Sequence, residues 1–477
     1  MISRTGVMMN LTEYNDNNFS RREFLYGAAL GTGALLANRS LMAAPKPTKR
    51  PKVAAVFTEL RFRSHAYNIL ENFMGPYLFG GHLTDPGVDV VSFYADQFPE
   101  RDMAREVAKR FGIPLFQSID EAMCVGGKEI AVDAVLSIGE HGEYPYNKLG
   151  QKMYPRKRFF DEIVAPMKRA NRFVPIFNDK HLSYRWDWAK EMYDTAKEHG
   201  IPFMAGSSVP LAQRLPAIDL PAGAEIEEAV AIHGGGFESY DFHGLELLQS
   251  FVESRTGGET GVAKVELLWG EKLQQALKSG RIPVKLADVA MQAETDGKMN
   301  RRAYPTSGRA KRPASQTKPK PKLKRPSGPH ALVVTYADGF QGTVMTVGSS
   351  ANRWNFACRL KGENKPRATA LFNGSWGNRC LFKALSHSIQ HLFRTGKEPY
   401  PVERTLLVTG ILDAAVRSFS ENRPIDTPHL GIAYRPIDFK LMRENGDSWD
   451  VITTDTPQPI EFTPGADAGF LNNKSKS

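Results

Sequence analysis

Titratable side chains gather on two loops in the first half of the chain. Residues 139–145 carry Glu140 and His141, and residues 178–181 carry Lys180. Such a concentration on turns exceeds what a purely structural connection needs. A lysine that is desolvated or lies near other positive charge loses its proton more easily, and a histidine can then carry the proton released when a hydroxyl is oxidised. These residue types are able to perform acid–base chemistry on a hydroxyl group.

A third candidate segment lies about sixty residues further along the chain. Residues 240–248 read Tyr-Asp-Phe-His-Gly-Leu-Glu-Leu-Leu, which places Asp241 and His243 at the start of an expected helix. A non-catalytic interpretation exists for each acid–base candidate. Lys180 would then be a solvated turn residue, and His243 would satisfy backbone groups at the start of the helix.

The sequence does not predict a metal site. Glu140, His141 and Glu143 are near neighbours in one loop, and adjacent side chains rarely point at a common centre. His387 and His391 have the spacing of helical metal ligands, but the leucines of that segment define the opposite, apolar face. We therefore expect both histidines on the wet side of their helix.

Short apolar runs alternate with amphipathic stretches between residues 52 and 205, as in the βαβ units of a parallel sheet. Ser118 and Glu121 have the spacing of a capping box at the start of one of the helices. This pattern predicts an α/β fold, with a Rossmann-like, doubly wound parallel sheet over residues 51–220. Ligands bind such a sheet at the carboxyl ends of its strands. The expected buried strands are residues 53–57, 88–93, 132–138, 173–177 and 201–205.

The loop after the first strand departs from an ordinary dinucleotide-binding sequence. Glycines in G-x-G-x-x-G let the backbone approach a pyrophosphate, whereas residues 58–65 contain no glycine. Arg61 and Arg63 are candidates to bind a phosphate by charge instead, or they are surface residues. Asp96, after the second strand, either accepts hydrogen bonds from an adenosine ribose or caps a helix. Bulky side chains filling the hollow at residues 60–64 would exclude hydride transfer.

The pattern changes after Pro221 to longer alternating strands with fewer crossovers. We expect an α+β domain over residues 221–463 on a large, open, mainly antiparallel sheet. Alternating Lys and Pro over residues 298–329 predict a disordered insertion, or alternatively a tether to an anionic surface. The tail at residues 464–477 is expected to be unstructured.

The distribution of charge along the chain indicates which partners to expect. The net charge is +10, but eleven Lys and Arg lie within residues 298–325, so the rest of the chain is nearly neutral and nucleic acid is not an expected partner. Three widely spaced cysteines exclude a disulfide framework.

Residues 20–25 read Ser-Arg-Arg-Glu-Phe-Leu and precede a mildly apolar run, which predicts a twin-arginine signal within residues 1–50. The expected partner is the twin-arginine export machinery, and the expected location is periplasmic or extracellular, with a membrane tether if the signal stays uncleaved.

Several segments resemble the Gfo/Idh/MocA family, the oxidoreductases of glucose-fructose oxidoreductase and inositol dehydrogenase type. Residues 172–207 follow the family order of strand, acid-Lys turn, helix, glycine and strand, so that Lys180 takes the place of the active-site lysine. Residues 240–248 are similar to the family helix in which a catalytic His is followed three residues later by Asp, here Glu246.

This resemblance implies an enzyme that oxidises or reduces a small carbohydrate or cyclitol with NAD or NADP. The alternative is a non-catalytic protein that binds a saccharide or a partner and has lost the nucleotide, and a lyase or hydrolase is a third hypothesis. We also expect association of copies through the second sheet. The implied catalytic residues are Lys180, His243 and Asp241, and the implied cofactor contacts are Arg61, Arg63, Asp96, Glu140 and His141.

Overall fold

The computed structural model describes residues 50–297, 325–326 and 328–474. Almost all of the expected export signal at residues 1–50, and most of the Lys-Pro stretch, lie outside these ranges. Within them, no helix combines the length and the apolarity needed to cross a membrane. These described residues belong to one compact unit.

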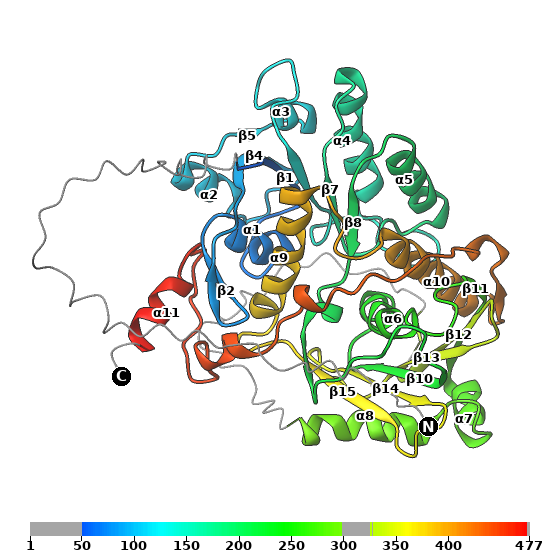
Figure 1. The fold of residues 1–477 in the computed structure, drawn as a ribbon. Helices are drawn as coiled ribbons and strands as arrows, with labels where there is room; N and C mark the ends of the chain where they lie inside the picture. The colour runs from blue at the N-terminus through cyan, green and yellow to red at the C-terminus, as the bar shows by residue number, and fades with distance from the viewer. Residues whose placement is uncertain (1–49, 298–324, 327, 475–477) are drawn as a thin grey trace, which may run out of the picture. The chain divides into compact units, whose positions relative to one another are not determined.

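The first sheet is parallel and has the strand order β5-β4-β1-β6-β7-β8, which confirms the doubly wound arrangement (Figure 1). Its central strand is apolar on both faces and buried from its second residue onward, as expected when helices cover both faces of a parallel sheet. The strands are β1 (Lys52–Phe57), β4 (Asp89–Ala95), β5 (Leu115–Phe116), β6 (Ala134–Ile138), β7 (Ile176–Asp179) and β8 (Phe203–Gly206).

Local signals in the sequence define several helix ends in this part. Ser118 and Glu121 form the expected capping box at the start of α3, and Gly112, with a φ of 65°, ends α2. A short hairpin of β2 (Tyr77–Phe79) and β3 (His82–Thr84) follows the first helix. The helices are α1 (His65–Phe73), α2 (Ala104–Phe111), α3 (Ile119–Cys124), α4 (Arg156–Ala170) and α5 (Trp186–Glu198).

The second sheet has the strand order β16-β11-β12-β13-β10-β14-β15-β9. Neighbouring strands are antiparallel except for the parallel pair β10 and β13, which confirms the mainly antiparallel prediction. The strands are β9 (Gln213–Leu215), β10 (Ile226–His233), β11 (Val262–Trp269), β12 (His330–Tyr336), β13 (Gln341–Thr346), β14 (Trp354–Leu360), β15 (Arg367–Phe372) and β16 (Ile425–Asp426).

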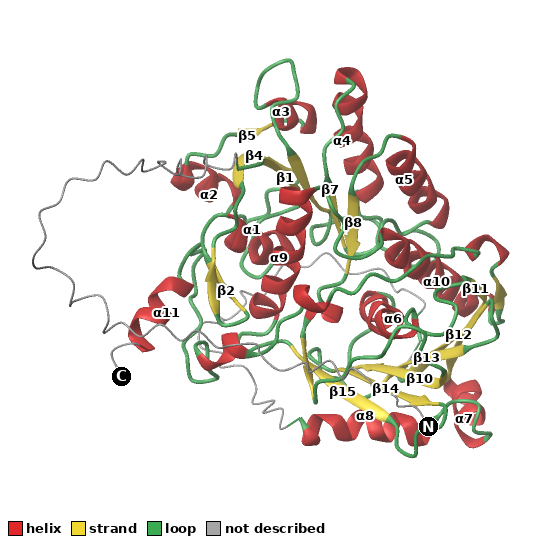
Figure 2. Cartoon of the chain, in the orientation of Figure 1, coloured by secondary structure: helices red, strands yellow, loops and turns green. Residues whose placement is uncertain are grey.

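Helices cover both faces of this second sheet (Figure 2). Alternate residues of β10 show this directly, because Ala229 and Ala231 join the core of α6 and α10, whereas Val230 and Ile232 pack against α8. Residues 467–474 form a helix that packs near α9, instead of the expected unstructured tail. The helices are α6 (Ser239–Val252), α7 (Gly270–Lys278), α8 (Val284–Asp296), α9 (Asn378–Thr395), α10 (Val402–Glu421) and α11 (Asp467–Lys474).

Two contacts join the parts of the chain that surround the first sheet's carboxyl edge. Helix α9 packs against α1, where Gln390 Nε2 donates to the Asn72 carbonyl at 2.8 Å. As a result, every residue of α1 is buried. Helix α10 is tied to the end of α6 by an ion pair, in which Arg404 Nε donates to Glu253 Oε2 at 2.9 Å. Both of these charged side chains are 1% exposed.

We predict that Arg404→Met lowers the free energy of unfolding by about 3–5 kcal/mol, because it leaves the Glu253 carboxylate buried without its cation. Arg417→Met, on the exposed side of the same helix, is the control and should change stability by less than about 0.5 kcal/mol. Urea titrations of both variants measure the difference. Equal stabilities would contradict the interpretation.

Candidate active site

A pocket of about 200 Å³ lies where the carboxyl ends of β6 and β7 meet helices α1, α6 and α9. Both sheets contribute to it, since α6 begins just after β10 of the second sheet. This is the edge at which an open parallel sheet binds ligands. The titratable and hydroxyl side chains in its lining include His65, Glu140, His141, Lys180, Ser239 and His243.

Lys180 follows β7 directly and has a φ of 64°. Its Nζ lies 3.1 Å from Glu140 Oε1 and 3.1 Å from Ser239 Oγ. The other oxygen of Glu140 accepts from Arg156. Burial alone would raise the pKa of Glu140, but Lys180 and Arg156 hold this pKa well below its usual range. Glu140 is therefore a buried carboxylate shared by two cations.

His243 is the second predicted acid–base residue in the pocket. Its Nδ1 lies 2.6 Å from the hydroxyl of Ser207, which orients the ring. Burial lowers the pKa of His243 well below its ordinary value, and the nearby charges of Lys180 and His65 lower it further. The lowered pKa keeps the imidazole neutral and makes it a weaker base than a free histidine.

The structure adds residues that sequence reasoning missed. His65 begins α1, and its Nδ1 lies 2.7 Å from Asp179 Oδ2. The His65 ring is 5.0 Å from the His141 ring and 4.7 Å from the Phe382 ring, between centroids. The sequence did contain a signal for His65, because this residue directly follows the loop after the first strand. The carboxyl ends of β1 and β7 lie at the same edge of the sheet, which brings His65 close to Asp179.

The two expected phosphate-binding arginines lie outside this pocket. Arg61 Nε donates to Glu59 Oε1 at 2.5 Å, so its charge is paired within the same turn. Arg63 is exposed and donates to Gln458.

Asp96, the predicted partner of an adenosine ribose, accepts hydrogen bonds from three side chains of the protein instead. The hydroxyl of Tyr94 donates to it at 2.9 Å and that of Tyr144 at 2.6 Å, while Arg158 donates at 2.5 Å. The next residue extends this network, because Gln97 Nε2 donates to the Glu143 carbonyl at 2.9 Å and Glu143 N donates to Gln97 Oε1 at 2.8 Å. The loop after β6 is thereby bonded to the loop after β4.

This bridge bears on the nicotinamide cofactor that the sequence resemblance implies. In a doubly wound sheet the dinucleotide crosses the end of the central strand, and here β1 lies between the two bridged strands. In the turn after β1, Thr58, Glu59 and Leu60 are at most 5% exposed, and Ser64 is buried. His65, the first residue of α1, packs its ring against Phe382 at the helix end where a pyrophosphate would bind. The residues of this crevice do not fit a dinucleotide as they stand.

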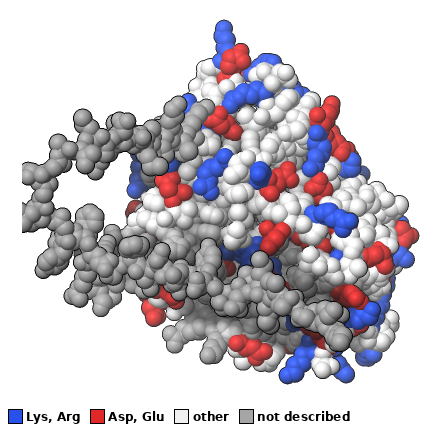
Figure 3. Space-filling view, in the orientation of Figure 1, with Lys and Arg blue, Asp and Glu red and all other residues white. Residues whose placement is uncertain are grey.

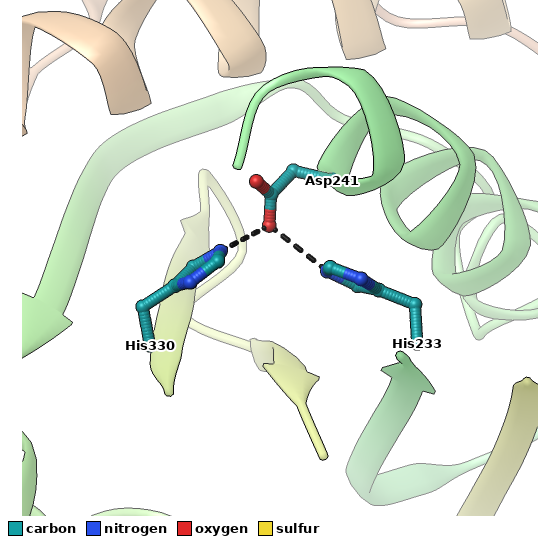
Figure 4. A group of neighbouring side chains, drawn as sticks. All are labelled: His233, Asp241 and His330. Atoms are coloured by element: carbon teal, nitrogen blue, oxygen red, sulfur yellow. Dashed lines mark hydrogen bonds and ion pairs between the residues drawn. The ribbon is translucent and has the colours of Figure 1, made fainter. Parts of the chain in front are cut away.

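Asp241, the third predicted catalytic residue, does not line the pocket but lies between two buried histidines (Figure 4). Its Oδ1 is 3.0 Å from His233 Nε2 and 2.8 Å from His330 Nε2, and its Oδ2 accepts from Glu238 N at 2.7 Å. Burial would raise the pKa of Asp241, but the two histidines lower it below its usual range. Burial lowers the pKa of His330, but the Asp241 carboxylate raises it by more. The net effect is a raised pKa for His330. The triad anchors the start of α6 to β10 and β12.

Two imidazoles and a carboxylate are also a common metal-ligand set, and their ligand atoms lie within 4.8 Å of one another. The backbone N–H of Gly235 donates to His233 Nδ1 at 3.3 Å, which makes this nitrogen an acceptor. The proton of His233 is therefore on Nε2, the atom that would have to bind the metal. The triad is better described as a carboxylate held by two ring N–H groups.

Glu246, at the position of the family's aspartate, also lies away from the pocket. Its Oε1 accepts from the hydroxyl of Thr405 at 2.8 Å, and burial raises the pKa of Glu246 to about 7. Of the catalytic residues that the sequence predicts, Lys180 and His243 line the pocket, whereas Asp241 does not.

No family model matches the sequence, and no curated protein matches it. Among solved structures, GenD2 from gentamicin A biosynthesis in complex with NAD is 13% identical, with a TM-score of 0.50 over 84% of this chain and 99% of GenD2. An oxidoreductase from Agrobacterium radiobacter in complex with NAD+, L-tartaric acid and magnesium is 13% identical, with a TM-score of 0.48 over 79% of this chain and 98% of that one. A putative myo-inositol dehydrogenase from Sinorhizobium meliloti is 12% identical, with a TM-score of 0.47 over 79% and 99%. The likeness to GenD2 shows that the two chains share a fold.

The buried triad predicts a pH-dependent stability. Because the folded-state pKa of His330 is raised, its contribution is present below the unfolded pKa of about 6.5 and is lost as the pH rises through the folded value. The lowered pKa of Asp241 makes its contribution present above about 3.9 and lost as the pH falls. The stability difference between the native chain and His330→Gln should therefore be largest at about pH 5–6 and smaller at pH 8.

Urea unfolding over this pH range measures that difference, and His82→Gln, at an exposed histidine, is the control. A difference for His330→Gln that is constant with pH would show that the ring is not charged in the folded state.

Proposed function

We propose that this chain is an enzyme that acts at a hydroxyl or carbonyl carbon of a sugar or cyclitol, with Lys180 and His243 as its acid–base pair. One observation carries the proposal. Lys180, held by a buried carboxylate, and the neutral imidazole of His243 line the same pocket, although Lys180 follows β7 of the first sheet and His243 lies on α6, after β10 of the second. Perturbed titratable groups in such a pocket are typical of active sites.

The pocket assigns a role to each side chain. Lys180, oriented by Glu140 and Ser239, donates to the substrate oxygen and stabilises the negative charge that develops there. His243, oriented by Ser207, takes the proton from the substrate. The pocket is small and polar, so it suits a hydroxyl-rich molecule about the size of one sugar ring.

Two reactions share this geometry. Proton removal next to a carbonyl, followed by loss of the neighbouring hydroxyl as water, needs no nucleotide and is favoured by the bridged crevice between Gln97 and Glu143. Oxidation of a hydroxyl with NAD or NADP is the second candidate, and the fold shared with the NAD complex of GenD2 favours it. In the second case the bridge would have to open so that the nicotinamide can accept the hydride.

Bound nucleotide separates the two reactions. The full chain, expressed in the cytoplasm, is denatured and its supernatant is analysed by absorbance and mass, and NAD and NADP are titrated into the native protein by calorimetry. Stoichiometric nucleotide supports the dehydrogenase. A nucleotide-free protein that binds neither cofactor supports the non-redox reaction.

We predict that Lys180→Met lowers kcat/KM by about 10²–10⁴, because the substrate oxygen loses its cationic donor. Turnover is followed by NMR in D₂O, as deuterium incorporation into or water loss from a panel of keto-inositols and ketoses, and by NAD(P)H formation with inositols and aldoses. Lys190→Met, at an exposed lysine paired with Asp194, is the matched control and should leave the rate unchanged.

Unchanged turnover in Lys180→Met would refute the assignment. A native chain inactive in both assays would favour the alternative, a non-catalytic saccharide- or partner-binding protein. Twin-arginine export, a periplasmic or extracellular location and association of copies through the second sheet stay predictions.

A further inference from the structure

A second concave site lies on the other side of the loop at residues 139–145, over the starts of α4 and α5. This aromatic groove is open and has a volume of about 640 Å³, within the range of small-molecule sites. The acid–base chemistry of the Lys180 pocket does not use it. Its aromatic lining consists of Tyr144, Tyr154, Tyr184 and Trp188.

The rings of the aromatic groove are held in fixed pairs. The centroids of Tyr144 and Tyr154 are 5.8 Å apart in an edge-to-face arrangement, and those of Tyr184 and Trp188 are 5.3 Å apart. The Arg185 guanidinium lies 4.6 Å from the Trp188 ring centre, although Arg185 is not part of the groove lining. Pre-positioned rings bind a ligand with a smaller entropic cost than free ones.

The charged side chains of the groove balance one another. Lys157 lies 2.7 Å from Asp161, and Arg158 lies 3.3 Å from Glu162. The lining thus carries two cations and two carboxylates, without an excess of either sign. Figure 3 shows basic and acidic side chains interspersed in the same way over the visible face. Such a lining offers hydrogen bonds to hydroxyl groups but no net attraction for a phosphate.

We propose that the aromatic groove binds pyranose rings of a neutral saccharide. The apolar C–H faces of a pyranose pack on aromatic rings, and its hydroxyls bond to the charged groups around them. A nucleobase would also stack on such rings, but the phosphates of a nucleotide would meet Asp161 and Glu162 as well as the two cations.

The groove is separate from the proposed active site, so this inference does not rest on the proposed function. Arg156 is fully buried between the two, with its guanidinium 4.8 Å from the Tyr154 ring centre on one side and bonded to Glu140 on the other. The Lys180 pocket, about 200 Å³, suits a single ring, whereas the open groove has room for a longer chain.

The test is direct binding of neutral trisaccharides to the full chain. Cellotriose, maltotriose, xylotriose and mannotriose are each examined by saturation-transfer NMR and by calorimetry. At least one should bind, and Trp188→Ala should weaken its affinity by about tenfold or more. Trp188→Phe, which keeps a ring, should stay within about threefold of the native affinity. Lys180→Met, in the other pocket, should bind as the native chain does.

Fluorescence provides a readout that does not depend on the alanine variant folding. The saccharide should change the tryptophan emission of the native chain, and this change should vanish in Trp188→Phe while binding persists. Failure of all four trisaccharides to bind up to millimolar concentration would overturn the proposal. So would binding that Lys180→Met removes and Trp188→Ala does not, or AMP binding that Trp188→Ala removes.

Discussion

The carboxylate of Glu140 is the interaction on which the candidate active site depends. It lies in the loop after β6, and it binds Arg156 at the start of α4 and Lys180 at the end of β7. A buried carboxylate is stable only with its cations in place, so these three side chains fix the relative positions of three segments. Gly139 permits the arrangement, since a Cβ at this position would lie 2.7 Å from Arg156 Cγ.

The same loop also explains why the nucleotide crevice is closed. Gly142, with a φ of 86°, turns the chain so that Glu143 meets Gln97, and a Cβ there would lie 2.8 Å from Gln97 Oε1. A dinucleotide-binding domain uses its backbone freedom in the first loop, where glycines admit a pyrophosphate. In this chain the glycine with the unusual backbone conformation lies in the loop after β6. There it permits a contact within the protein, between Glu143 and Gln97.

Local patterns predicted the parts of the structure that depend on local physics. Alternating apolar runs predicted the strand positions, and the spacing of Ser118 and Glu121 predicted a capping box. Lys180 and Glu140 were identifiable because the carboxyl ends of parallel strands meet at one edge. His387 shows the limit of this reasoning. The apolar periodicity of its helix predicted that His387 is exposed to solvent. This prediction is wrong, because the β2–β3 hairpin covers the residue and its ring stacks on Phe79 at 4.0 Å between centroids.

Contacts between distant segments could not be predicted in this way. The family resemblance implies a catalytic role for Asp241, yet its partner His330 comes from a strand that begins 89 residues later. Nothing in the local pattern around either residue reports that pairing. The same holds for Arg404 and Glu253, which are 151 residues apart.

The triad nevertheless bears on the pocket, through the geometry of α6. Residues two apart on an α-helix point about 200° away from each other, so Asp241 and His243 lie on nearly opposite sides. Asp241 holds the start of the helix against β10 and β12, and His243 on the other side is thereby directed toward Lys180. A residue outside the pocket thus sets the position of the proposed base. The placement of Lys180 and His243 in one pocket therefore depends on the second sheet as much as on the first.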